Sequence, residues 1–154
     1  MKVNNNYIIP LKKNVGTDKK IGIVKSIWNI EITDRFYEGC YNTLLNYGVK
    51  KNNIFTKEVP GSFELIHGAK TIFKKKNTDA VILIGCIIKG ETPHFEFISQ
   101  AVANGVKDLN IKYDIPFIFC VSTDLSISQS MERSGGKYGN KGTDSALAAL
   151  QLIK

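Results

Sequence analysis

The chain has 154 residues, of which 43% are hydrophobic and 23% charged, and it carries a formal net charge of +7, values typical of one globular domain. Its longest apolar run, AVILIGCII at 80–88, has nine residues, whereas a membrane helix needs about 20, and the N-terminus lacks the apolar core of a secretory signal. All basic residues except Arg35 and Arg133 are lysines spread along the chain, so we expect a solvated surface that attracts small anions, without a nucleic-acid or membrane partner.

The cysteines and histidines argue against a disulfide framework or a metal site. Cys40, Cys86 and Cys120 have no CxxC spacing, which predicts buried, reduced thiols in a cytoplasmic protein. His67 and His94 have no Cys or His at ligand spacing. His67 lies within a helical pattern, and we interpret it as structural.

Strands and helices alternate from about residue 20 onward. We treat residues 1–154 as one domain in which 1–18 form a polar N-terminal extension. Strands are predicted at 21–26, 53–60, 79–88 and 116–122, and helices at 33–48, 62–76, 94–112, 126–135 and 140–154. Thr33 is the predicted N-cap of the first helix, and Asn140 or Thr143 that of the last. The core face predicted for the third helix comprises Phe97, Ile98, Ala101, Val102, Gly105 and Leu109.

This alternation predicts an α/β fold with a parallel sheet covered by helices on both faces. Ligands bind such sheets beyond the carboxyl ends of the strands. Candidate site residues are therefore sought at the strand-to-helix junctions, 27–31, 60–64, 86–94 and 122–126.

The junction PGSFE, residues 60–64, has two interpretations. Ser62 and Glu64 fall in the first turn of a helix, where a serine can cap the helix and a carboxylate complements its dipole. The same groups also form a donor–acceptor set for a polar ligand such as a pyrimidine edge.

The junction GETPH, residues 90–94, could form an anion-binding turn. Gly90 permits a left-handed backbone, and Thr92 offers a hydroxyl at a helix start. His94 is either a capping or surface histidine or a group for proton transfer near neutral pH.

The segment MERSGGKYGNKG, residues 131–142, brings Arg133, Lys137 and Lys141 into a glycine-rich stretch. That combination suits a phosphate, although a solvated connection between helices has the same composition. Trp28, at a strand end, is either a core aromatic or a platform for a flat ligand. Phe119, inside a strand, is by default a core residue.

Taken together, VPGSFE, GCIIKGETPHFEF and ERSGGKYGNKG resemble the lumazine synthase family, and the resemblance covers about residues 20–154. It implies a flavodoxin-like three-layer sandwich with a four-stranded parallel sheet, and an N-terminal strand (NNNYIIP) that joins a neighbouring subunit. It also implies condensation of 5-amino-6-(D-ribitylamino)uracil with 3,4-dihydroxy-2-butanone 4-phosphate, which yields 6,7-dimethyl-8-ribityllumazine, phosphate and water. Neither a metal nor an organic cofactor is expected, and the resemblance implies active sites between adjacent subunits of a pentamer.

The resemblance also assigns site residues by position. Contacts to the pyrimidine and its ribityl chain are expected from Trp28, Ser62, Phe63, Glu64, Cys86, Ile87, Ile88 and Phe119. Contacts to the butanone phosphate are expected from Glu91, Thr92, Arg133 and Lys141. His94 matches the proton donor, Trp28 the aromatic that stacks on the pyrimidine, and Phe119 an aromatic from the neighbouring subunit.

A few positions depart from the commonest family pattern. Lys89 stands where arginine is common, so a bidentate contact is not expected there, and we interpret it as a solvated or loop-bracing lysine. Trp28 stands where phenylalanine is also frequent, and Cys86 where small or hydroxylated residues are frequent. We expect the contacts of Cys86 to run through its backbone.

Two alternative functions would each require residues that differ from those present. A flavodoxin-like protein that binds a flavin or nucleotide phosphate would need phosphate-binding glycines after its first strand, and SIWNIE at 26–31 has none. A shell protein or lumazine-binding module with a silenced site would have lost Arg133 or His94, and both are present.

The assembly is predicted from the same resemblance. In the family, an insertion between the last two helices blocks the packing of pentamers into icosahedral shells. SGGKYGNKG carries no insertion, so we favour a sixty-subunit capsid over a free pentamer. Riboflavin synthase is a possible partner inside such a shell.

Overall fold

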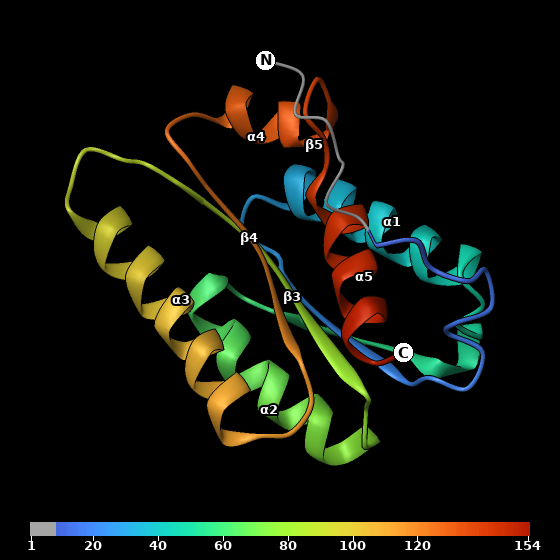
Figure 1. Ribbon diagram of the computed structural model, residues 1–154. Coiled ribbons are helices and arrows are strands. Elements are labelled where there is room, and N and C mark those ends of the chain that lie inside the picture. The colour runs from blue at the N-terminus through green and yellow to red at the C-terminus, as the bar shows by residue number, and fades with distance from the viewer. Residues whose placement is uncertain (1–8) are drawn as a thin grey trace.

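A four-stranded parallel sheet forms the centre of the computed structural model, which describes residues 9–154 (Figure 1). Its strands are β1 (Ile21–Ser26), β2 (Ile54–Val59), β3 (Ala80–Ile88) and β4 (Phe117–Asp124). They lie in the order β2-β1-β3-β4, which begins like the order of flavodoxin-like sheets. The predicted α/β fold is confirmed.

Helices cover both faces of the sheet (Figure 1). One face packs against α1 (Ile30–Asn46) and α5 (Lys141–Leu152), and the other against α2 (Leu65–Lys76) and α3 (His94–Lys112). Beyond the carboxyl ends of the strands lies α4 (Ile127–Arg133). The remaining short elements are η1 (Lys51–Asn53), η2 (Ser62–Glu64), β5 (Ser134–Gly136) and β6 (Gly139–Asn140).

The strand β3 supplies apolar side chains to both layers of the core. Ile82 and Ile84 point to the α1 and α5 side, and Val81 and Leu83 to the α2 and α3 side; all four are fully buried. Burying one such side chain contributes about 1.5–3 kcal/mol. The continuous apolar run therefore reflects a strand covered on both faces.

Three local features differ from the sequence prediction. The first helix begins at Ile30 and not after Thr33, because Asn29 adopts a left-handed conformation (φ 57°, ψ 47°) and precedes the first turn. Phe97 and Ala101 of α3 are exposed, and its buried stripe is Val102, Val106 and Leu109. The stretch after α4 forms the antiparallel pair β5–β6, whose strands are too short to show a periodicity.

A nearly buried lysine ties three elements together near the carboxyl end of β1. Lys25, 6% exposed, forms ion pairs with Asp34 of α1 and Glu58 of β2. Burial acts to lower the pKa of Lys25, but the hydrogen bonds and charges of both carboxylates outweigh it, so the pKa is raised overall. These ion pairs fix α1 against the two strands that precede the site.

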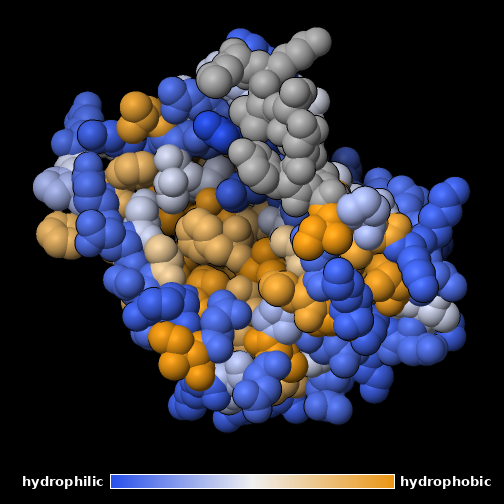
Figure 2. Space-filling view, viewed as in Figure 1, coloured by the Kyte–Doolittle hydropathy of each residue, from blue (hydrophilic) through white to orange (hydrophobic). Residues whose placement is uncertain are grey.

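The outer strands of the sheet are β2 and β4. Apolar surface gathers over β4 between α3 and α5 (Figure 2), where Ile118 and Phe119 are only partly buried. The predicted N-terminal strand, residues 4–10, falls mostly outside the described residues. Within residues 9–154, no helix is long and apolar enough to cross a membrane.

Candidate active site

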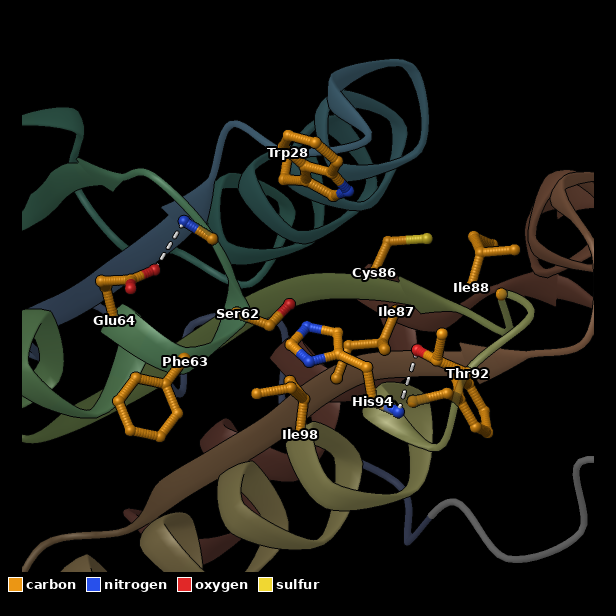
Figure 3. A pocket seen from close by; sticks show the side chains of 13 residues that line it. Trp28, Ser62, Phe63, Glu64, Cys86, Ile87, Ile88, Thr92, His94 and Ile98 are labelled. Carbon is orange, nitrogen blue, oxygen red and sulfur yellow. Dashed lines mark hydrogen bonds between the residues drawn. The ribbon is translucent and has the colours of Figure 1, made fainter.

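A cavity of about 580 Å³ lies beyond the carboxyl ends of β1, β2 and β3 (Figure 3). This is where a parallel sheet is expected to bind a ligand. Its walls are formed by Trp28, Gly61, Ser62, Phe63, Glu64, Cys86, Ile87, Ile88, Gly90, Thr92, His94, Phe95 and Ile98. Three of the four predicted junctions therefore meet at one site.

The indole of Trp28 stands at the rim of the cavity and is 72% exposed. Its backbone N–H donates to the carbonyl of Pro60 at 3.0 Å. The next residue, Asn29, donates its side-chain amide to the carbonyl of Cys86, also at 3.0 Å. Trp28 is therefore not a core aromatic, and its backbone is held between the ends of β2 and β3.

The segment Gly61–Glu64 forms a second wall. Ser62 is 7% exposed and packs so closely on β3 that a Cβ at Gly85 would lie 2.6 Å from its Oγ. Ser62 is not the cap residue of η2, since Gly61 occupies that position. The carboxylate of Glu64 accepts the N–H of Gly61 at 2.9 Å, so Glu64 also stabilises the turn.

The end of β3 forms the floor of the cavity through Cys86, Ile87 and Ile88. The thiol of Cys86 lies 3.5 Å from Ser130 Oγ, and burial raises its pKa. Burial also raises the pKa of Cys40 well above its ordinary value, and that of Cys120 to about 11. The prediction of buried thiols outside any disulfide is confirmed.

The start of α3 closes the cavity with Thr92 and His94 (Figure 3). The Thr92 hydroxyl accepts the backbone N–H of His94 at 3.4 Å. The imidazole is exposed and lies toward Ser62 and Ile87 (Figure 3). Gly90 does not take the left-handed conformation that we considered, since it is not among the residues of positive φ.

Lys89, just before this turn, is braced by two contacts. Its ammonium group forms an ion pair with Glu96 of α3 at 3.5 Å. Its backbone N–H donates to the carbonyl of Asp124 at 3.0 Å. Lys89 therefore connects the end of β3 to both α3 and β4.

Four predicted site residues do not line this cavity: Phe119, Glu91, Arg133 and Lys141. Phe119 lies on the outer strand β4, and Lys141 begins α5. Arg133 ends α4, where its Nε lies 3.3 Å from Asp124 Oδ1. One chain thus brings together most of the predicted pyrimidine site but not the predicted phosphate site.

Sequence reasoning missed several residues of the site. Phe95 and Ile98 line the cavity, although we placed Ile98 in the core of the third helix. Ile98 is four residues after His94, a spacing that puts both on one helix face and could have identified it. Asn29 and Asp124 lie in the candidate junctions 27–31 and 122–126, but the sequence did not single them out, because their contacts join distant segments.

No metal site emerges from the described residues, since within 9–154 no three His, Cys, Asp or Glu side chains cluster at ligand distance. The residues that line the cavity combine hydrogen-bonding groups with aromatic and aliphatic side chains, which suits a polar ligand with a flat ring. Serine, carboxylate and imidazole groups stand beside Trp28, Phe63 and several isoleucines.

Comparison with known proteins identifies the family of the chain. The profile of the 6,7-dimethyl-8-ribityllumazine synthase family matches residues 18–154. The chain belongs to this family. It therefore carries out the lumazine synthase reaction of riboflavin biosynthesis, as the sequence predicted.

Relatives from several bacteria bear the same name, 6,7-dimethyl-8-ribityllumazine synthase. The protein of Flavobacterium johnsoniae is 51% identical over 135 residues, which are 88% of this chain and 71% of the relative. That of Parabacteroides distasonis is 47% identical over 137 residues, 89% of this chain and 86% of the relative. That of Flavobacterium psychrophilum is 50% identical over 144 residues, 94% of this chain and 74% of the relative.

Proposed function

We propose that the cavity binds the ribitylaminouracil substrate and that a neighbouring copy of the chain supplies residues for the butanone phosphate. The observation that carries the proposal is the division of the predicted site. The cavity is lined by the predicted pyrimidine-binding residues Trp28, Ser62 to Glu64, and Cys86 to Ile88. Outside it, on β4, α4 and α5, are Phe119, Arg133 and Lys141. Two copies are needed if all of these residues act on one reaction.

Within the cavity, each group is assigned a role from its chemistry. Trp28 stacks on the flat pyrimidine, since its ring is exposed at the rim. Ser62 and Glu64 bind polar edges of the pyrimidine and the ribityl hydroxyls. The backbone of Cys86, Ile87 and Ile88 borders the ring.

Each step of the reaction requires a proton transfer, and one imidazole can donate and accept these protons. The substrate amine attacks the ketone, loss of water gives an imine, and phosphate is then eliminated. Tautomerisation and ring closure follow, with loss of a second water. His94 is the proton donor in this proposal because it lies in the cavity near the expected reacting atoms.

The phosphate of the second substrate needs positive charge and backbone donors. Arg133 provides a guanidinium fork, Lys141 a further cation, and the turn at Glu91 and Thr92 lies at the start of α3. These groups stabilise phosphate as it departs. Holding two reactants together contributes much of the remaining rate.

Exposed apolar surface supports a partner subunit. Trp28 and Phe97 are each 72% exposed, and Phe63 is 59% exposed, and apolar groups also gather over β4 (Figure 2). We propose pentamers that pack into a sixty-subunit shell, with residues 1–18 of the single domain (1–154) contacting a neighbour. A cytoplasmic shell of this kind could enclose riboflavin synthase.

Subunit complementation tests the divided site. His94→Ala and Arg133→Ala chains are co-expressed and the mixed assemblies are purified, with each variant alone as a reference, and lumazine formation is followed by absorbance. If the two residues act across a subunit boundary, random mixing restores about a quarter of the sites. If both residues act within one subunit, the mixture shows only the mean activity of the two variants, and the proposal is wrong.

A further inference from the structure

Asp124 is a nearly buried carboxylate that contacts Arg133. It ends β4 and is 8% exposed. Its Oδ1 lies 3.3 Å from Arg133 Nε, and its Oδ2 accepts the hydroxyl proton of Ser130 at 2.6 Å. Ser130 is fully buried, and its Oγ lies 3.4 Å from Ser122 Oγ. One oxygen of the carboxylate is thus anchored in a buried polar cluster, and the other faces the arginine.

The contact constrains only one edge of the guanidinium. Nε is the atom that meets Asp124, and the guanidinium carbon lies 5.5 Å from the ring centroid of Tyr138. The Arg133 side chain remains 54% exposed. Within residues 9–154, Asp124 is the one ion-pair partner of Arg133, and the closest contact is through Nε. The Nη edge, which suits bidentate binding of a phosphate, is therefore presented outward.

The contacts that Asp124 makes within the fold do not by themselves call for a negative charge. The register of β3 and β4 here depends on its backbone carbonyl, which accepts the N–H of Lys89. A neutral acceptor could satisfy the hydroxyl of Ser130 equally well. Burying a carboxylate has a desolvation cost that a neutral residue avoids. The ion pair with Arg133 is the contact of Asp124 that depends on its charge.

We propose that Asp124 is a positioning residue that fixes Arg133 for the phosphate of the butanone substrate. This inference rests on the proposed function, in which Arg133 binds that phosphate. A guanidinium held at Nε loses less freedom when its Nη groups close on an anion. The charge of Asp124 alone would weaken phosphate binding, because a carboxylate repels phosphate. Asp124 contacts Nε, on the edge away from the two Nη groups, so we expect the positioning effect to be larger than this repulsion.

The test compares Asp124→Asn with Asp114→Asn by steady-state kinetics in the intact assembly. Asparagine keeps the shape of Asp124 but removes the negative charge that forms the ion pair with Arg133. We expect the KM for the butanone phosphate to rise about fivefold, with the KM for the pyrimidine substrate unchanged. Asp114 is exposed, precedes the other end of β4 and carries the same charge, so its variant should leave both KM values unchanged.

Asp124→Asn is also measured in a chain that already carries Arg133→Gln. If Asp124 acts through Arg133, Asp124→Asn causes no further rise in KM when Arg133 is already replaced. The proposal is overturned if the effect persists in that background, if both KM values rise together, or if the KM for the butanone phosphate falls. If Arg133→Gln alone leaves this KM unchanged, the proposed phosphate role of Arg133 fails first, and the role of Asp124 fails with it.

Discussion

At the scale of single residues, position relative to the cavity separates groups that look alike in sequence. His94 lies in the cavity, whereas His67 is exposed on α2 and does not line it. Arg133 stands outside the cavity with its Nε held by Asp124. Cys86 borders the cavity, yet its thiol is buried. Residue type alone predicts none of these differences, because each depends on contacts between distant segments.

The roles proposed for His94 and Arg133 predict an order of damage. His94→Ala should lower kcat/KM about tenfold, because water can replace an exposed proton donor and positioning contributes much of the rate. Arg133→Ala should lower it about a hundredfold, since water replaces a phosphate-binding cation poorly. Steady-state kinetics with both substrates measures the order, and His67→Ala serves as a neutral control. Greater damage from His94→Ala would contradict the ranking.

At the scale of elements, the site depends on how closely η2 packs against β3. The packing leaves no room for a side chain at Gly85, where a Cβ would lie 2.6 Å from Ser62 Oγ and 2.9 Å from Leu65 Cδ1. Gly90 lines the same cavity, but a Cβ there would meet nothing within 4 Å. The two glycines therefore form a matched pair for testing this contact.

We expect Gly85→Ala to displace η2 and with it Ser62, Phe63 and Glu64. The overpacking should lower the free energy of unfolding by about 1–3 kcal/mol and raise the KM for the pyrimidine substrate. Gly90→Ala should leave both quantities nearly unchanged. Denaturant titration and steady-state kinetics provide the measurements. Equal effects of the two substitutions would show that crowding against η2 is not the cause.

At the scale of the whole molecule, the cavity of one chain lacks several of the predicted site residues, and several apolar groups are exposed. Phe97 on α3 and Trp28 at the cavity rim are the most exposed aromatic side chains in the described residues. The outer strand β4 adds the partly buried Phe119. These features fit a protein whose surface is completed by further copies of itself.

The proposed shell has a clear signature in analytical ultracentrifugation. Sixty chains of 17.1 kDa form a particle of about 1 MDa, compared with about 86 kDa for a pentamer. We expect the larger species to predominate at neutral pH. A sample that contains only the pentamer-sized species would contradict the shell but not the proposal of a divided active site.

The alternation of strands and helices, the parallel sheet and the family could all be predicted from the sequence. Those features follow from local periodicity and from motifs whose residues are close in the chain, such as PGSFE and GETPH. Tertiary structure decided which junctions share a cavity, that the first helix starts at Ile30, and that Phe97 faces outward. It also brought Asp124 to Arg133 and Asn29 to Cys86. Such contacts depend on packing between separate elements, and short-range patterns in the sequence do not encode them.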